Sequence, residues 1–369
     1  MAGYNTSGFA DCLLNSLAEL NKDKLNVMMP QNKFYMVDEF MKQTGEVIEG
    51  GTTIQENWIY DVAAKDKTKR YFKSGTQRQG HLINNTVVGN TPIFTGGYDV
   101  SYIEEQILAN RKPAKIVDEL KRIRVSEHVS FLTGMDGDFW GVADETSGVA
   151  TQLFGIPEYI VPITAAQISA ATTLGGSFQG ANRDGRSDMC GVDLSDSTYA
   201  SLRNYNAAWT NSEGTIASTD RVRIAELLWQ MDFKAPDDVK ELDTPPFKNK
   251  RIYTNDTMWQ QLGVVKEQLN DNIGADITKY HNSHFINGIT VRRVKELETA
   301  STTYRGYNPM YFINLDLLRF RKDAKKWMRH NPVQLVPMTT DSFVEYVDIR
   351  GQMMPIDPQK CGAMINWNE

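Results

Sequence analysis

The sequence predicts an α+β fold. The chain has 369 residues, of which 41% are hydrophobic and 23% are charged, a composition typical of a globular protein with an adequate core. Segments with helical and strand periodicity are mixed without the alternating strand–helix order of a parallel sheet, and this favours the α+β class. The formal net charge of −6 argues against a protein dedicated to nucleic acid, although it allows local basic patches.

Composition and motifs exclude several classes of function. No run approaches the roughly 20 apolar residues that a membrane helix needs, so we expect no membrane partner. The N-terminus lacks a signal-peptide pattern. The three cysteines, Cys12, Cys190 and Cys361, are far apart, which indicates a reducing compartment. The sequence has no phosphate-loop, dinucleotide or nucleophile motif, so we expect no enzyme and no cofactor.

The N-terminal region predicts two short amphipathic helices, at residues 9–21 and 33–42, separated by Met29-Pro30. Two helices of this length cannot bury their apolar faces by themselves. We therefore expect them to pack against the main body of the chain or against a neighbouring chain.

Residues 52–100 predict two strands joined by a long polar tip. Residues 65–80 contain six cationic side chains and one anionic side chain, Asp66, which gives a local charge of +5. The cations are Lys65, Lys67, Lys69, Arg70, Lys73 and Arg78. A mobile surface loop is the plain alternative, but loops this long are uncommon in compact domains unless they are functional. Tyr71 and Phe72 would also suit nucleic acid, yet the acidic chain favours a protein–protein contact.

The next segment predicts a strand at residues 98–108 and one long helix from Pro113 to about Gly134. Proline suits the first helical turn, and a helix of this length spans about 33 Å. One broad face is apolar, and it consists of Pro113, Ile116, Val117, Leu120, Ile123, Phe131 and Met135. Arg111, Lys115 and Arg122 lie on the opposite face. Arg124 and Glu127 fall on the apolar face, three residues apart, where they can pair.

The C-terminal half mixes short strands and helices around a loop-rich stretch at residues 163–215. We expect helices at 219–231 and after Asn255, which is a suitable N-cap. The expected strands are 153–162, 250–254, 286–294, 310–314 and 334–338, followed by two strands within 342–367 around a turn at Gly351.

Two short patterns suggest metal sites without supporting one. His281 and His284 form the only close histidine pair, but a third ligand and a defined helix are missing. Asp136-Gly137-Asp138 is similar to the start of a calcium loop, yet Ser147 occupies the twelfth position, where such a loop needs glutamate. We therefore expect a turn at residues 136–138 and no bound metal.

The order of these parts resembles that of a tailed-phage major capsid protein of the Hong Kong 97 type. Three local phrases carry the resemblance: GTTIQENW at residues 51–58, FGIPEYIV at 154–161 and NPMYFIN at 308–314. The resemblance implies an N-terminal arm (1–48), an extended loop (49–98), a peripheral domain (99–152) whose spine helix is 113–134, an axial domain (153–320), and a C-terminal return to the peripheral domain (321–369).

The resemblance also implies a function and a set of partners. Such a protein self-assembles into hexamers and pentamers of an icosahedral bacteriophage head that encloses double-stranded DNA. It would be located in the virion capsid and assembled in the host cytoplasm. The expected partners are further copies of the chain, a scaffolding protein, a portal at one vertex, packaged DNA and decoration proteins. Met1 suggests that the scaffolding protein is a separate chain.

Two contacts follow as hypotheses. The basic loop tip, with Lys67, Lys69, Arg70, Tyr71, Phe72, Lys73 and Arg78, would dock on the acidic strand of a neighbour at Asp99, Glu104 and Glu105. Arg111, Lys115 and Arg122 of the spine helix would face packaged DNA without sequence specificity. The alternatives are an encapsulin-like shell around protein cargo and a metal-dependent hydrolase that uses His281 and His284.

Overall fold

The protein forms two compact units, each built from several separate stretches of the chain. The computed structural model describes residues 35–42, 47–48, 50–60, 86–103, 113–141, 153–161, 163, 175–179, 188–210, 222, 224, 226, 249–268, 284–286, 289–298, 308–335 and 342–368. The first unit comprises Met1–Gly50, Ile93–Gly137 and Arg321–Gly351. The second comprises Gly51–Pro92, Asp138–Phe320 and Gln352–Glu369. The sequence instead grouped 321–369 as one segment and assigned 49–98 to a separate loop.

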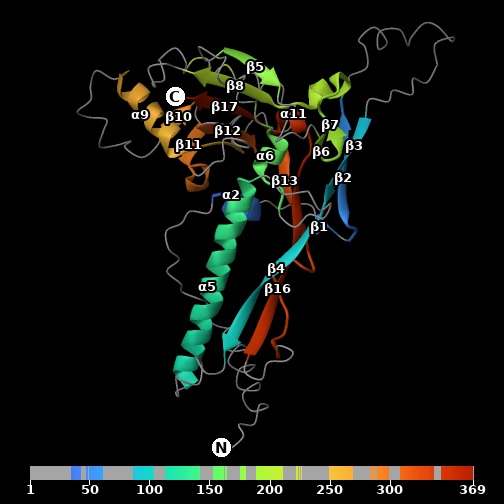
Figure 1. Cartoon of the computed structure of the whole chain (residues 1–369), viewed down its shortest axis with the longest axis vertical. Coiled ribbons are helices and arrows are strands. Elements are labelled where there is room, and N and C mark those ends of the chain that lie inside the picture. The colour runs from blue at the N-terminus through green and yellow to red at the C-terminus, as the bar shows by residue number, and fades with distance from the viewer. Residues whose placement is uncertain are drawn as a thin grey trace, which may run out of the picture. The chain divides into compact units, whose positions relative to one another are not determined.

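In the first unit, helix α5 lies beside strands β4 and β16 (Figure 1). These two strands form a long antiparallel pair that runs from Ser342 opposite Ile103 to Gly351 opposite Phe94. The remaining strands of the six-stranded sheet are short. The elements are α2 (Tyr35–Lys42), β1 (Val47–Ile48), β4 (Phe94–Ile103), α5 (Pro113–Phe139), β13 (Leu318–Asp323), β14 (Arg329–His330), β15 (Gln334–Leu335) and β16 (Ser342–Pro355).

The predicted turn at Gly351 is wrong, because β16 continues through this residue to Pro355. Gly351 still pairs with Phe94, since one glycine weakens a strand without ending it. The chain reverses instead through α11 (Pro358–Cys361), where proline occupies the first turn. The second strand, β17, then begins at Gly362.

Helix α5 begins at Pro113 as predicted, but it runs to Phe139 and does not end near Gly134. The predicted turn at Asp136-Gly137-Asp138 is therefore wrong, because these residues are helical. Met135 and Phe139 are buried in the last turns. Packing of these apolar side chains offsets the cost of about 1 kcal/mol that each helical glycine carries.

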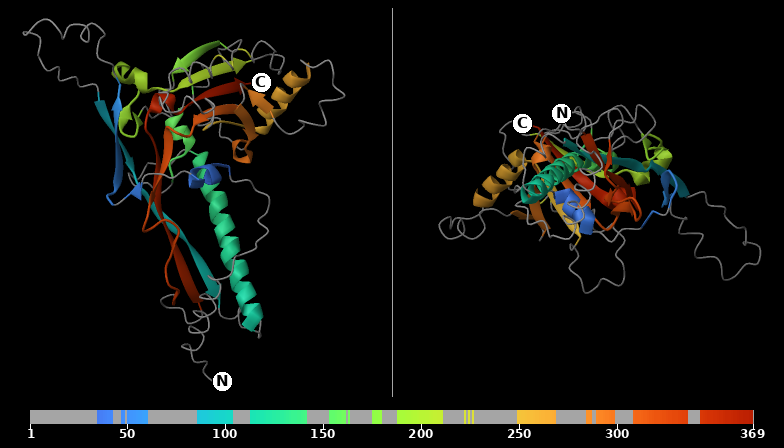
Figure 2. Two further views of the ribbon diagram at one scale, coloured as in Figure 1. Left: turned by 180° about the vertical axis from the view of Figure 1, so that it is seen from behind. Right: turned by 90° about the horizontal axis from the view of Figure 1, so that it is seen from below.

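The second unit contains a mixed seven-stranded sheet in the order β10-β11-β9-β12-β17-β8-β5 (Figure 2). Parallel pairs occur between β11 and β9 and between β17 and β8, and the other pairs are antiparallel. The strands are β5 (Gly175–Gln179), β8 (Tyr205–Thr210), β9 (Lys250–Thr254), β10 (His284–Ile286), β11 (Ile289–Arg293), β12 (Pro309–Asn314) and β17 (Gly362–Asn368). The α+β class predicted from the sequence is confirmed.

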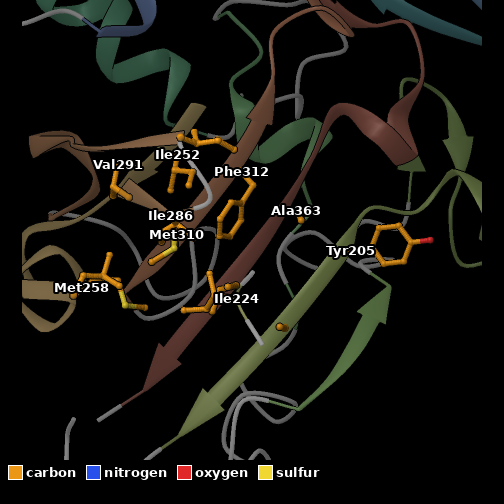
Figure 3. Close-up of a cluster of buried hydrophobic side chains, with 13 residues drawn as sticks. Tyr205, Ile224, Ile252, Met258, Ile286, Val291, Met310, Phe312 and Ala363 are labelled. Atoms are coloured by element: carbon orange, nitrogen blue, oxygen red, sulfur yellow. The ribbon is translucent and has the colours of Figure 1, made fainter. Parts of the chain in front are cut away.

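The apolar cluster of this unit lies on the sheet and beneath helix α9 (Asp256–Gln268). Ile252, Met310 and Phe312 contribute from the central strands, and Met258 and Leu262 from α9 (Figure 3). Asn255 caps α9 as predicted, because its Oδ1 accepts a hydrogen bond from the Met258 amide at 3.0 Å. The strand expected at residues 286–294 corresponds to β11, which forms an antiparallel hairpin with β10.

Residues 153–161 do not form the strand predicted at 153–162. They contain the single-turn helix α6 (Ile156–Tyr159), which has proline in its first turn. Gly155 precedes it where a Cβ atom would lie 2.1 Å from the carbonyl oxygen of Gly141. Only glycine allows this close approach, so backbone packing, and not alternation of side chains, determines the local structure.

Strands β2 (Thr53–Ile59) and β3 (Thr86–Pro92) form a separate antiparallel ribbon in the second unit. They confirm the two predicted strands on either side of the polar tip. Three smaller elements complete this unit: the hairpin of β6 (Asp188–Met189) and β7 (Val192–Asp193), and the 3-10 helices η1 (Ser197–Leu202) and η3 (Lys295–Leu297). Helix α2 agrees with the helix expected at 33–42, and the helix expected at 9–21 lies outside the described residues. Among the described residues, no helix is long and apolar enough to span a membrane.

Candidate functional site

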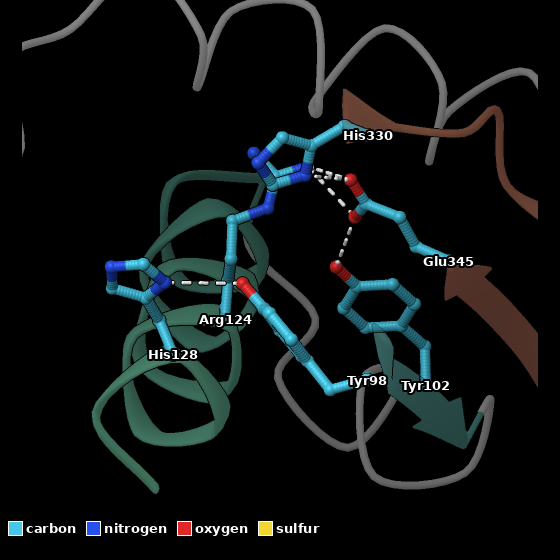
Figure 4. A network of polar contacts seen from close by, with 6 residues as sticks. All are labelled: Tyr98, Tyr102, Arg124, His128, His330 and Glu345. Atoms are coloured by element: carbon cyan, nitrogen blue, oxygen red, sulfur yellow. Dashed lines mark hydrogen bonds and ion pairs between the residues drawn. The ribbon is translucent and has the colours of Figure 1, made fainter. Parts of the chain in front are cut away.

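A buried carboxylate, Glu345 of β16, joins helix α5 to the strand pair of the first unit (Figure 4). Arg124 Nη2 of α5 donates to both of its oxygens, at 2.6 and 2.7 Å. Tyr102 of β4 donates its hydroxyl to Oε2 at 3.0 Å. His330 Nδ1 of β14 lies 2.8 Å from Oε1, and it must carry the proton because a carboxylate only accepts. One carboxylate thus ties together four secondary-structure elements.

A second contact lies beside this network on the same face of the strands. The Tyr98 hydroxyl of β4 lies 3.1 Å from His128 Nδ1 of α5 (Figure 4). The Tyr98 ring stacks on Phe131, with 5.0 Å between ring centroids. Tyr98 and Tyr102 are four residues apart on one strand, so both point toward the helix. The helix is therefore held to β4 by polar and aromatic contacts at successive turns.

The charges of this network favour the ionised carboxylate. Burial by itself would raise the pKa of Glu345, but hydrogen bonds from His330 and Arg124 outweigh burial and lower it to about 2. Burial raises the pKa of Tyr102, and the charge of Glu345 raises it further. Burial, together with the nearby His330, lowers the pKa of His128. Tyr102 thus stays protonated as a donor, while Glu345 stays ionised as an acceptor.

The C-terminal part of α5 holds helix α2 through another buried carboxylate. Asp136 Oδ1 accepts hydrogen bonds from the amides of Met36 and Val37, at 3.2 and 3.4 Å. These amides are in the first turn of α2, where an acceptor is normally supplied by the helix's own N-cap. Met36 and Phe40 are buried. The amino end of the short helix is thus fixed to α5, and its apolar face is buried.

The residues predicted to take part in contacts are only partly within the described ranges. The loop-tip residues Lys67, Lys69, Arg70, Tyr71, Phe72, Lys73 and Arg78 lie outside them, as do Glu104, Glu105 and Arg111. Asp99 of β4 is exposed. It pairs with Tyr346 and lies on the face opposite Tyr98, since neighbouring strand residues alternate. Arg122 is exposed on α5, and Lys115 is on the same helix.

The helical spacing of Arg124 and Glu127 allowed a pair without predicting it, and the partner of Arg124 that the structure shows is Glu345. No helical spacing connects residues 124 and 345, so sequence reasoning missed Glu345, His330 and Tyr102. One sequence pattern does mark Glu345. It is a charged residue within the strand segment FVEYV, and such a residue is rarely buried without a partner.

The histidine pair gains no support as a metal centre. His284 is buried on strand β10, where its ring lies against Trp259 with 4.3 Å between centroids, and His281 lies outside the described residues. Within the part of the chain that the structure describes, no three His, Cys, Asp or Glu side chains gather in a way that could hold a metal ion.

Comparison with known proteins identifies the fold. No protein-family model matches the sequence, and no curated protein matches it. A chain of the cyanophage A-1(L) capsid is similar in structure, with a TM-score of 0.52 over 93% of this chain and 96% of that chain. The chain has the phage capsid fold of the Hong Kong 97 type. The sequence identity of the two chains is only 13%. The capsid fold that the order of parts predicted is confirmed.

Two further structures are similar to this capsid fold at lower scores. A chain of the cyanophage P-SCSP1u capsid has a TM-score of 0.47 at 11% identity, over 88% of this chain and 86% of that chain. The SrpI encapsulin of Synechococcus elongatus has a TM-score of 0.44 at 8% identity, over 95% of this chain and 94% of that chain. Both scores are below 0.5, so the fold assignment rests on the first likeness.

Proposed function

We propose that the chain is a structural major capsid protein, which self-assembles into the hexamers and pentamers of an icosahedral phage head around double-stranded DNA. The observation that carries this proposal is the likeness to a capsid chain along nearly the whole length of both proteins. A likeness over a small part of either chain would suit a shared domain, whereas one over 93% of this chain and 96% of that chain suits a shared role in a shell.

Electron microscopy of the purified full-length chain tests this function. We expect closed particles of uniform diameter, formed by the chain alone or together with a co-expressed scaffolding protein. Monomers or irregular aggregates under every assembly condition would refute the proposal. Shells that enclose a docked protein cargo and no DNA would instead identify an encapsulin-like compartment.

The proposal includes a contact between the basic loop tip of one copy and the acidic strand of the next. The exposure of Asp99, on the face of β4 that points away from α5, supports it. Surface ion pairs contribute only about 0–1 kcal/mol each, so they would determine register and orientation more than affinity.

Charge reversal at Lys69, Arg70 and Lys73 tests this contact. We expect the triple glutamate variant to form fewer or malformed shells, with a changed dependence on salt. The control is the set Lys69→Arg, Arg70→Lys and Lys73→Arg, which keeps every charge. Normal shells with the parental salt dependence in the glutamate variant would exclude the pairing.

A second part of the proposal concerns packaged DNA. Arg111, Lys115 and Arg122 would lie on the side of the shell that faces the genome, where they would neutralise phosphates without reading sequence. Exposure of Arg122 supports this role. Replacing all three by glutamine should reduce the fraction of filled particles and spare empty shells. An unchanged filled fraction would contradict it.

The scaffolding protein, portal and decoration proteins are further partners that co-purification of assembling heads would reveal.

A further inference from the structure

The ribbon formed by β2 and β3 is fixed to the rest of the second unit at three points along its length. A two-stranded hairpin is at best marginally stable by itself in water. Its direction therefore depends on the contacts that hold it. The three points involve the end of β16, the β6–β7 turn and helix η1, which are separate elements.

Trp58 makes the first contact. Its indole is almost fully buried, at 2% exposure, and Nε1 donates to the carbonyl oxygen of Pro355 at 3.1 Å. The ring lies directly on Gly89 of the paired strand, where a Cβ atom would come within 2.4 Å of the indole. Glycine is thus needed at residue 89 so that the tryptophan can cross the ribbon and reach β16.

Cys190 makes the second contact, from the turn between β6 and β7. Its carbonyl oxygen accepts a hydrogen bond from the Asn90 amide at 2.8 Å, and its sulfur accepts one from Thr91 Oγ1 at 3.1 Å. Cys190 and Gly191 have φ angles of +52° and +77°. Such two-residue turns favour Asn, Asp or Gly at both positions. Cys190 therefore adopts a left-handed backbone conformation that is disfavoured for cysteine. The contacts of Cys190 with β3 compensate for this cost.

Tyr60 makes the third contact, at the end of β2. Its ring meets Tyr199 of η1 edge to face, with 5.1 Å between centroids. Its carbonyl oxygen accepts a hydrogen bond from the Ser201 hydroxyl. With this contact, both strands of the ribbon are held, and the contacts are spread along its length. Three separated points of attachment prevent pivoting, which a single point would allow.

These contacts are distinct from the apolar cluster beneath α9, which contains neither Trp58 nor Cys190. We therefore expect that loosening them leaves this cluster in place. The outward face of the ribbon is uncharged, because it carries Thr53, Gln55, Asn57, Ile59, Thr86, Val88 and Asn90. Such a face supplies no electrostatic steering, so we infer that the three contacts determine the orientation of the ribbon.

We propose that Trp58 and Cys190 are positioning residues, which fix the direction of the ribbon relative to the seven-stranded sheet and thereby select the curvature of the shell. The inference rests on the proposed function, since it concerns how copies of this chain meet.

Two conservative variants test the inference in the full-length chain. Trp58→Phe keeps an aromatic ring but removes the donor to Pro355, and Thr91→Val keeps the shape but removes the donor to Cys190. Asn57→Ala is the matched control, because Asn57 is next to Trp58 on β2 but exposed. Hydrogen exchange of the β2 and β3 amides measures the ribbon locally, and electron microscopy measures particle diameter and shape.

We expect the double variant to unfold at close to the parental temperature, with ribbon amides that exchange about thirty-fold faster, as the loss of two net hydrogen bonds implies. Its particles should be variable in diameter or open, while Asn57→Ala forms parental shells. Parental shells from the double variant would overturn the inference and leave the proposed function intact. If the parental chain forms no shells, the proposed function fails and the inference fails with it. If the double variant does not fold, the single variant Thr91→Val tests the inference by the same hydrogen exchange and electron microscopy.

Discussion

Replacing Glu345 with glutamine should destabilise the first unit strongly at neutral pH and hardly at all near pH 2. The pKa of Glu345 is lowered from 4.5 to about 2, and its side chain is only 3% exposed. One pKa unit corresponds to about 1.4 kcal/mol, so the ionised carboxylate contributes about 3 kcal/mol to the free energy of unfolding.

The sign of the pH dependence follows from the lowered pKa. Because the folded state favours the ionised form, the contribution is fully present above pH 4.5 and is lost as pH falls from 4.5 toward 2. Glutamine cannot ionise, and it leaves the Arg124 charge buried without a counter-charge from residue 345. The difference between parent and variant should therefore be about 3 kcal/mol at pH 7 and below about 1 kcal/mol at pH 2.

Urea-dependent hydrogen exchange of the β4 and β16 amides, corrected for intrinsic rates, measures this difference within the first unit. A whole-chain melting curve would mix two units and is less suitable. Asp99→Asn is the control, since it removes an exposed carboxylate from the opposite face of β4 and should change stability by less than about 0.5 kcal/mol. A Glu345→Gln difference that is the same at pH 2 and pH 7 would refute the reasoning.

Three further substitutions have expected effects on stability. Asp136→Ala removes the acceptor for the Met36 amide and should cost about 1–2 kcal/mol, seen as faster exchange in α2 but not in β4. Gly97→Ala places a Cβ atom 2.1 Å from the Val347 carbonyl oxygen; it should destabilise the β4–β16 pair by about 1–3 kcal/mol, whereas unchanged urea unfolding would exclude this close approach. Asn255→Ala removes the α9 cap and should cost about 1 kcal/mol, while Asn255→Asp, which restores an acceptor, should recover most of it in thermal unfolding.

The parts of the fold that were predictable are those encoded by local periodicity. The strand-like segment Lys250–Thr254 and the cap at Asn255 predicted β9 and the start of α9 correctly. Pro113 correctly marked the beginning of α5. In each case, the deciding interaction connects residues a few positions apart, so a sequence window contains it.

The errors occurred where distant packing overrides local preference. Glycines at 134 and 351 suggested breaks, yet the helix and the strand both continue, because neighbouring side chains or a paired strand hold them. The segment at 153–162 looked like a strand because it is apolar. Its conformation is instead determined by the approach of Gly155 to the backbone at residues 138–141, which no periodicity reveals.

The polar contacts that organise this protein connect residues about 100 to 300 positions apart, from Asp136 with Met36 to Trp58 with Pro355. Glu345 with Arg124 is of the same kind. Each contact fixes the direction of an element, α2, the ribbon or α5, and none of them forms a reaction centre among the described residues. If copies of this chain assemble into a shell, as proposed, a small error in direction is repeated at every copy, and these contacts would then matter for assembly beyond their share of stability. Substitutions that leave the unfolding temperature unchanged but make the particles non-uniform should therefore occur mostly at such contacts. Substitutions in the apolar core should lower the unfolding temperature and disturb the particles together. A set of assembly-defective variants confined to the apolar core would show that stability alone governs assembly.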